Sequence, residues 1–475
     1  MIADLKPYLK YKNSGLPWLE RLPSHWNVRR SKYLFREVDQ RSVTGDETRL
    51  SMSQRHGLVP SSKIEEQRLT SASNVGGKLC EAGDMVLNRL KAHLGVLALA
   101  PTQGLVSPDY TVLRPVGVAN HRYFCSVYRS PYCGQELRQR AKGIVEGFWR
   151  LYTDDFYDIP VPVPPPDEQA LIVRFLDWTN DRLERTIRAK RKVIVLLNEQ
   201  KQAMIHRAVT RGLDPDVPLK HSGVPFIGEI PLTWQVRRLR TLVYRIEQGV
   251  SPQASGFLAA GNTWGVLKSG CVNRGVFRQT EHKQLARNFE IDPAIVVKIG
   301  DVLISRACGS PSLVGSVGRV RALDYRLILS DKIFRACFRR EVDEDFMVLS
   351  MNSSYYRRQV EQSISGAEGM ANNLPLSSLR DFVFAIPSHE EASEIALFVN
   401  REVQEIDVVA SRLEIEIELL REYRTRLVAD VVTGKLDVRV AAEQLPPSLV
   451  DDDECPVNEN IDMLHNAEDD EFEDN

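Results

Sequence analysis

The sequence predicts an α+β protein of two tandem globular domains, each followed by a long α-helix, with the two helices packed on one another. Three observations predict this fold class. One stretch of sequence occurs twice, about two hundred residues apart. Two long segments lack proline and glycine and carry apolar residues at helical spacing. The remaining segments are short and β-rich, with glycine or proline between them. A repeat of this length indicates domain duplication, because solenoid repeats run about 20 to 50 residues.

The repeat opens with SGLPWLERLPSHWNVRR at Ser14–Arg30 and SGVPFIGEIPLTWQVRR at Ser222–Arg238, an offset of 208. Further along, AGDMVLNR and IGDVLISR match at an offset of 217. From Ser107 onward the offset is 223, and it stays constant to the closing VTRGLD and VTGKLD. The offset increases twice, so we expect insertions between these motifs and a constant framework around them.

The globular half of each copy contains short stretches with strand character, such as DMVLNRL and YTVLRPV in the first and VVKIGDVLIS and KIFRACFRR in the second. A helix is predicted in each half, over residues 123–140 and 346–363. The least similar segments are LSMSQRHGLVPSSK and NRLKAH in the first copy, and VLKSGCVNRG and SRACGSPS in the second. They are rich in side chains that hydrogen-bond bases and phosphates, although solvated loops have the same composition.

The first helical segment runs from Asp167 to Val209, with Pro166 before it and Gly212 after it, as expected at helix ends. About 40 residues at ~1.5 Å rise make a rod of roughly 60 Å. Apolar residues recur in alternating steps of three and four in both copies, which is typical of a seam between helices. Packing of each helix on its own domain is the alternative. The predicted seam residues are Ile172, Leu176, Leu183, Ile194, Leu197, Ile395, Val399, Ile406, Leu413 and Leu420.

The charge of the chain is unevenly distributed. Residues Asp451–Asn475 hold twelve acids and no lysine or arginine, and we expect this tail to be disordered. The formal net charge is −2, so the rest of the chain carries about +10. A basic body is compatible with a polyanionic partner without requiring one. No apolar run approaches the roughly 20 residues that cross a bilayer, and no signal peptide is recognisable, so a cytoplasmic location is expected.

Motifs of several enzyme classes are missing. The sequence contains no GxxxxGK[ST] phosphate loop, no HExxH, no GxSxG and no NPPY-like or DPPY-like tetrapeptide. The seven cysteines include no CxxC pair, so neither a zinc site nor a disulfide framework is expected. We therefore expect no catalysis by this chain alone and no bound metal.

The repeated SG(L/V)P(W/F) opening, the GD(M/V)(V/L) stretch, SPDY at Ser107, and PPPDEQALI leading into a helix that ends at VTRGLD together resemble the DNA-specificity subunit of type I restriction-modification systems. The resemblance covers residues from about 10 to 440 in the family's order. Two departures are the second helix start, PSHEEASEI, and the acidic tail. The implied organisation is a first target-recognition domain at 1–165, a first spacer helix at 166–212, a second target-recognition domain at 213–388, a second spacer helix at 389–440 and a tail at 441–475.

The resemblance implies a non-catalytic protein that reads double-stranded DNA. Each recognition domain would bind one half of a split, asymmetric target, and the helices would pack as an antiparallel coiled coil that sets the gap. Two methyltransferase subunits would dock on it, with restriction subunits that translocate and cleave DNA, in a system of phage defence. No cofactor is expected in this chain. S-adenosylmethionine, ATP and Mg²⁺ would belong to the partner subunits.

The DNA-contacting candidates are polar residues in the dissimilar segments. Arg89 and Arg306 occupy equivalent framework positions, so they favour phosphate over base contact, or a structural ion pair. Trp26 and Trp234 also belong to the framework, and we predict core packing for both. The full set of candidates is Gln54, Arg55, Asn88, Arg89 and Lys91 in the first domain and Lys268, Asn273, Arg274, Arg306 and Ser310 in the second.

Two other functions stay open at the level of sequence. One is a divergent single-chain nuclease or methyltransferase, which would modify or cut DNA without partners. The other is a coiled-coil protein-interaction scaffold, which would show no salt-sensitive DNA binding.

Overall fold

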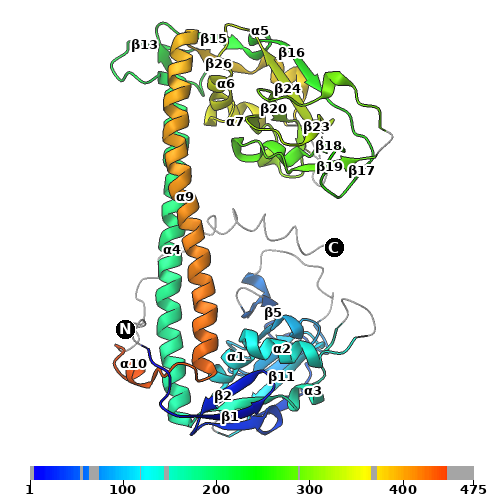
Figure 1. Ribbon diagram of the computed structural model, residues 1–475, viewed down its shortest axis with the longest axis vertical. Coiled ribbons are helices and arrows are strands. Elements are labelled where there is room, and N and C mark those ends of the chain that lie inside the picture. Colours follow the sequence, from blue (N-terminus) through cyan, green and yellow to red (C-terminus); the bar gives the residue numbers. More distant parts are fainter. Residues whose placement is uncertain are drawn as a thin grey trace. The chain divides into compact units, whose positions relative to one another are not determined.

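A computed structural model describes residues 5–53, 57–63, 74–117, 119–143, 149–286, 289–364 and 372–446 (Figure 1). The chain divides into two compact units. The first combines residues 1–191 with 414–475, and the second comprises residues 192–413. The two longest helices, α4 (Pro166–Arg211) and α9 (His389–Val432), each contribute to both units. The predicted α+β fold class, with two long helices that pack together, is confirmed.

The first unit is built around a four-stranded antiparallel sheet with the order β4 (Phe35–Val38), β11 (Tyr110–Pro115), β8 (Met85–Asn88) and β9 (Leu97–Leu99). Helices α1 (His121–Arg129) and α2 (Pro131–Arg140) contribute buried side chains to the same core. The remaining elements are β1 (Tyr11–Leu16) paired with β2 (Leu19–Pro23), β3 (Asn27–Arg30) with β12 (Pro160–Val163), β5 (Leu50–Ser53) with β6 (Gly57–Pro60), β7 (Lys78–Cys80) with β10 (Gly104–Val106), and the short helices η2 (Ser31–Tyr33), η3 (Ser61–Lys63), η4 (Ala92–Leu94) and α3 (Thr153–Tyr157).

The second unit repeats this sheet as β16 (Val243–Gln248), β24 (Ile333–Phe338), β20 (Val302–Ser305) and β22 (Val317–Arg319). A second four-stranded sheet is formed by β17 (Ala254–Ser255), β19 (His282–Leu285), β18 (Trp264–Leu267) and β23 (Arg326–Ile328). The other elements are β13 (Leu219–His221) paired with β14 (Glu229–Pro231), β15 (Gln235–Arg238) with β26 (Val383–Ile386), β21 (Ala307–Cys308) with β25 (Asn372–Asn373), helices α5 (Leu239–Leu242), α6 (Glu344–Ser350), α7 (Ser354–Glu361) and α8 (Leu376–Asp381), and the 3-10 helices η5 (Ser269–Gly275), η6 (Pro293–Ile295) and η7 (Pro311–Leu313).

The element bounds follow the three offsets of the sequence repeat. Strands β4 and β16 begin 208 residues apart, β8 and β20 are 217 apart, and β11 and β24 are 223 apart. The first increase in offset falls between β16 and β20, where the second unit carries β17, β18 and β19. The insertions therefore enlarge the second unit around an unchanged central sheet, as the sequence predicts.

The helix predicted in each half is in fact two short helices. In the first unit the break falls at Ser130, whose side chain caps α2 by accepting a hydrogen bond from the backbone N of Cys133 (3.4 Å). Pro131 then occupies the first turn of α2, where its missing N–H costs nothing. The second unit breaks between α6 and α7 at the matching position, before Ser354. A Ser-Pro step inside an apolar pattern was the signal of the break.

Each framework tryptophan packs in the core and donates to a glutamate in the first turn of a long helix. Trp26 Nε1 donates to Glu168 (3.0 Å) and Trp234 Nε1 donates to Glu391 (2.9 Å), and both indoles are fully buried. The glutamates lie 223 residues apart, so the repeat extends to side-chain hydrogen bonds. Core packing of both tryptophans is confirmed.

Helices α4 and α9 run antiparallel. In the first unit Glu184 pairs with Arg424 and Lys190 pairs with Glu416, so numbers fall on α9 as they rise on α4 (Figure 1). In the second unit Lys201 pairs with Asp407 at 2.6 Å. Where only the two helices pack on each other, without a globular core beside them, the seam residues stay partly exposed to solvent. The predicted seam residues Ile172, Leu176, Leu183, Ile395 and Val399 are buried, whereas Ile194, Leu197, Ile406, Leu413 and Leu420 are half-buried.

The end of the second long helix differs from the prediction. Helix α9 stops at Val432, and the chain turns at Gly434 into a short helix, α10 (Arg439–Glu443). Ala442 and Leu445 are buried in the core of the first unit, so residues 441–446, predicted to belong to the tail, are folded. Apolar residues spaced three and four apart after Val438 could have shown this. None of the helices in the described part of the chain is long and apolar enough to cross a membrane.

Candidate nucleic-acid interface

In the first unit, the candidate Asn88 is a loop-forming residue rather than an exposed one. It ends β8, is 9% exposed, and its Oδ1 accepts hydrogen bonds from the backbone N of Leu90 (3.1 Å) and of Lys91 (3.3 Å). The side chain thereby turns the chain outward after β8, and the Lys91 side chain is exposed there. Asn88 thus shapes the loop that carries the exposed Lys91 side chain.

The equivalent arginines Arg89 and Arg306 make equivalent bonds. Arg89 donates to the backbone carbonyls of Asp109 (Nε, 2.7 Å) and Pro108 (3.2 Å). Arg306 donates to the carbonyl of Asp331 (3.0 Å), which is 223 residues after Pro108. Each guanidinium therefore tethers the loop before a central strand to the end of the neighbouring strand. Both are half-buried, so a partner can reach only their remaining donors.

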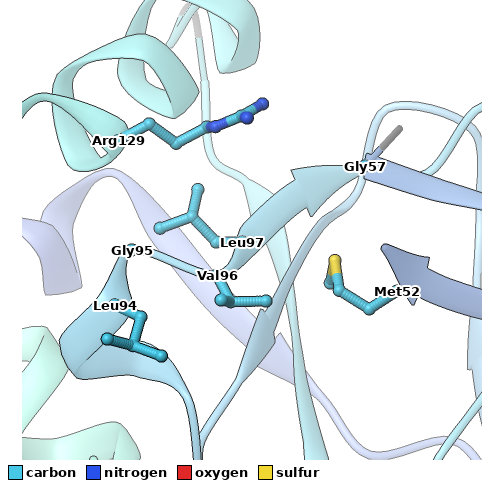
Figure 2. A pocket seen from close by; sticks show the side chains of 7 residues that line it. All are labelled: Met52, Gly57, Leu94, Gly95, Val96, Leu97 and Arg129. Atoms are coloured by element: carbon cyan, nitrogen blue, oxygen red, sulfur yellow. The ribbon is translucent and has the colours of Figure 1, made fainter. Parts of the chain in front are cut away.

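Two first-unit candidates, Gln54 and Arg55, lie outside the described residues. The strands β5 and β6 on either side of them pair antiparallel from Leu50 with Pro60 to Ser53 with Gly57. Figure 2 shows that Met52 and Gly57, from this hairpin, line a pocket together with Leu94–Leu97, which follow the Asn88–Lys91 loop. The structure thus brings the first dissimilar segment next to the residues that directly follow the second one, although they are some 40 residues apart in sequence.

The second unit brings its two dissimilar segments together as well. Helix η5 carries the candidates Asn273 and Arg274 and packs against β21 and η7, which flank the candidate Ser310. Arg274 is exposed and has a left-handed backbone conformation, with φ of +57°. A non-glycine residue rarely adopts it, and such conformations concentrate at functional sites.

The polar side chains of this second surface differ in how they are engaged. Lys268 Nζ lies 3.5 Å from Glu281 Oε2, with both side chains about two-fifths exposed, so the pair is screened by water. Ser310 Oγ shares a hydrogen bond with Ser312 Oγ (2.8 Å) at the exposed start of η7. Asn273 Oδ1 is buried without a hydrogen-bond partner in the described structure. A buried acceptor without a hydrogen bond costs free energy, which distinguishes the Asn273 amide from the other polar side chains of this surface.

Sequence reasoning missed one exposed cation next to the first surface. Arg129 ends α1 and lines the pocket in Figure 2. The repeat contained a signal for it, because the equivalent residue at the 223 offset is Asn352. An arginine that replaces an asparagine at an otherwise equivalent position marks a difference in chemistry between the two copies.

No group of three or more His, Cys, Asp or Glu side chains in the described ranges is arranged to hold a metal ion.

Comparison with known proteins found specificity subunits and a solved chain of type I restriction-modification systems. No family model matches the chain. The type I restriction enzyme EcoEI specificity subunit of Escherichia coli is 25% identical over 50% of this chain, but the match spans only 39% of that subunit. The putative type I restriction enzyme MjaX specificity subunit of Methanocaldococcus jannaschii is 26% identical over 92% of this chain and 99% of its own length. A solved chain from a type I R-M system covers 87% of this chain and 99% of its own, with a TM-score of 0.63 and 15% identity, and so shares its fold.

Proposed function

We propose, from the premise that this chain belongs to the family of type I restriction-modification specificity subunits, that it selects the DNA sequence on which such a complex acts. One structural observation supports this function above the others. Each unit presents two dissimilar polar segments on a framework in which the hydrogen bonds of Arg89 and Arg306, and of Trp26 and Trp234, are repeated. A constant scaffold with two different polar surfaces is suited to reading two different sequences.

Each domain would read one half of a bipartite, asymmetric target. Basic side chains such as Lys91 and Arg274 would bind phosphates and give salt-dependent affinity. Well-placed polar side chains would discriminate bases, each good bidentate pair contributing about 1 to 3 kcal/mol. Two linked readers bind far more tightly than either one alone, provided the linker allows both to engage.

We further propose that the paired helices α4 and α9 fix the gap between the half-sites. Their 46 and 44 residues, at ~1.5 Å each, correspond to rods of nearly 70 Å. A rod of that length exceeds one DNA turn of about 34 Å. Adding one heptad to both helices should lengthen the gap in the target without changing either half.

The chain would carry out no chemical step itself, and would determine the DNA sequence at which a larger assembly acts. Two methyltransferase subunits would bring S-adenosylmethionine, and restriction subunits would bring ATP and Mg²⁺. Exposed apolar residues on α9 support docking of other subunits, since single-chain surfaces seldom leave such side chains uncovered in a row. They include Leu397 and Val408 in the second unit and Ile415 and Leu419 in the first, between 44% and 76% exposed.

The proposal is tested by expressing the chain with a type I methyltransferase subunit in cells and mapping methylated adenines by single-molecule sequencing. A gapped motif with one modified adenine in each half is expected. Methylation or cleavage of DNA by the purified chain alone, with Mg²⁺ and S-adenosylmethionine, would instead support the single-chain enzyme. A stable complex without salt-sensitive DNA binding would leave the protein-interaction scaffold.

A further inference from the structure

The second unit exposes two large apolar side chains next to each other on one loop. Phe257 is 77% exposed and Leu258 is 46% exposed, whereas Ala259 after them is buried. The loop directly follows β17, the edge strand of the sheet with the order β17, β19, β18 and β23 (Figure 1). Adjacent exposed apolar side chains, unlike scattered ones, commonly mark a site of interaction with another molecule.

The backbone of this loop is fixed on both sides of the apolar pair. The carbonyl of Phe257 accepts a hydrogen bond from the backbone N of Gln284 on β19 (2.9 Å). The backbone N of Ala259 donates to Nε2 of His282, also on β19 (2.9 Å). The two side chains are therefore held in the solvent by a bonded backbone, and their exposure does not come from a lack of backbone contacts.

The imidazole of His282 connects the apolar loop with a neighbouring basic turn. His282 is fully buried, and because its Nε2 accepts from Ala259, its Nδ1 carries the proton and donates to the carbonyl of Gln279 (2.6 Å). Gln279 directly follows Arg278, which is exposed and donates to the carbonyl of Asn273 (3.2 Å). One buried side chain thus holds the apolar pair beside the turn from η5 to β19, in the surface that the proposed function assigns to DNA.

The charge of this part of the second unit favours a polyanionic partner. Residues 249–287 contain five Lys or Arg residues and one acid, Glu281, and five minus one gives a net charge of +4. The single acid lies 3.5 Å from Lys268, so it is already engaged with a cation. Proteins that kink DNA insert apolar wedges, Phe and Leu among them, between base steps. Basic side chains beside such a wedge position it by binding phosphates.

We propose that Phe257 and Leu258 form an apolar wedge that inserts between two base pairs of the DNA read by the second domain, while Arg278 binds a phosphate beside it. The inference rests on the proposed DNA-reading function and adds a recognition element to it. Flexible steps such as TA and CA/TG unstack at the lowest cost, so the wedge selects such a step without a hydrogen bond to a base. His282 is the positioning residue of the wedge.

The first test is DNA affinity, measured for the complex of the full-length chain with the methyltransferase subunit on a duplex that carries its mapped methylation motif. Phe257→Ala should weaken binding about 5- to 150-fold, the range for loss of an aromatic ring stacked on a base. Phe257→Leu keeps an apolar wedge and should lose less. Tyr244→Ala is the matched control and should leave the affinity unchanged, because Tyr244 is also an exposed aromatic residue of the second unit (66%) but lies on β16.

The second test detects unstacking directly. Fluorescent base analogues that stacking quenches, 2-aminopurine for adenine and pyrrolo-cytosine for cytosine, are placed one at a time through the target and its flanks. The methylated adenines and their neighbours are left out, because a methyltransferase flips its target base itself. The wild-type complex should brighten at one step in or beside one half-site, and Phe257→Ala should abolish that signal. Arg278→Ala should keep the signal and reduce the salt dependence of binding by about one phosphate contact.

The inference is overturned if Phe257→Ala binds the target as tightly as the wild type, or if no analogue brightens in the wild-type complex. It is also overturned if Phe257→Ala weakens association with the methyltransferase subunit in the absence of DNA, because the loop is then a protein-docking surface. Absence of any methylation motif in the wild type would instead overturn the proposed function itself, and the wedge with it. Leu258→Ala, which truncates the other half of the pair, keeps the test valid if Phe257→Ala fails to fold.

Discussion

The glutamates that open the two long helices offer a matched test of how each unit is held together. Glu168 is 4% exposed and accepts hydrogen bonds from Tyr8 Oη (2.6 Å), His25 Nε2 (2.7 Å) and Trp26 Nε1 (3.0 Å). Among the described residues Glu391, its counterpart in the second unit, accepts a side-chain hydrogen bond from Trp234 alone. Replacing each glutamate with alanine should therefore destabilise the first unit more than the second.

The magnitude follows from the donors that each substitution leaves behind. In Glu168→Ala, the buried Trp26 N–H and Tyr8 hydroxyl lose their acceptor, while the half-exposed His25 can bond to water. At about 1 to 3 kcal/mol per buried unsatisfied group, the loss is about 2 to 6 kcal/mol. Glu391→Ala leaves one such donor and should cost about 1 to 3 kcal/mol. The difference is one buried donor, or roughly a 5- to 150-fold difference in the opening equilibrium.

Hydrogen exchange measured by mass spectrometry on the full chain reads the two units separately. Amides of β8 and β11 report on the first unit, and those of β20 and β24 report on the second. Protection in β8 and β11 should fall further in Glu168→Ala than protection in β20 and β24 falls in Glu391→Ala. Glutamine at either site keeps one oxygen acceptor and should restore part of the loss. Equal losses in the two variants, or unchanged protection of β8 and β11 in Glu168→Ala, would refute the reasoning.

Two further predictions concern the segments that close the units. Gly434 and Gly212 both have φ near +75°, but a Cβ on Gly434 would lie 2.7 Å from Pro23 Cγ, whereas the atom nearest to a Cβ on Gly212 would be 3.4 Å away. Gly434→Ala should therefore lower the urea midpoint of the first unit more than Gly212→Ala lowers the urea midpoint of the second. Equal shifts of the two midpoints would contradict the predicted clash. The pKa of Asp437 is lowered: burial alone would raise it, but the hydrogen bonds and charge of Arg439 outweigh burial. The lowered pKa of Asp437 stabilises the fold above the unfolded value of about 3.9, and this stabilisation is lost as pH falls through the folded value. The protection of amides 433–445, measured relative to the intrinsic exchange rate at each pH, should therefore be lower near pH 3 than near pH 7, and Arg439→Ala should reduce that dependence.

The framework was predictable because its signals are local and occur twice. Gly, Pro and Trp positions established the repeat, and helical spacing with Pro166 and Gly212 located α4 within a few residues. The break at Ser130 was missed because the apolar pattern continues across it, and the capping Ser-Pro step was given too little weight.

The candidate interface was harder to predict, because burial and side-chain engagement depend on contacts between distant segments. Asn88 was a predicted DNA contact but is bonded within its own loop, and Arg89, predicted to contact phosphate or form an ion pair, donates to the carbonyls of Pro108 and Asp109. Arg129 was missed because it lies in a helix rather than in a polar loop. Composition identified the segments that converge, whereas the roles of their residues required the fold.

The central claim is that each domain reads its own half-site, and a domain duplication tests it most directly. Residues 35–160 of the first domain are replaced by residues 243–383 of the second, with junctions at β4/β16 and β12/β26, where the two frameworks correspond. The hybrid is expressed with the methyltransferase subunit, and methylated adenines are mapped. The account predicts a gapped motif whose two halves are both the second domain's half-site, with the first half-site lost. Retention of the original asymmetric motif by the hybrid would contradict it.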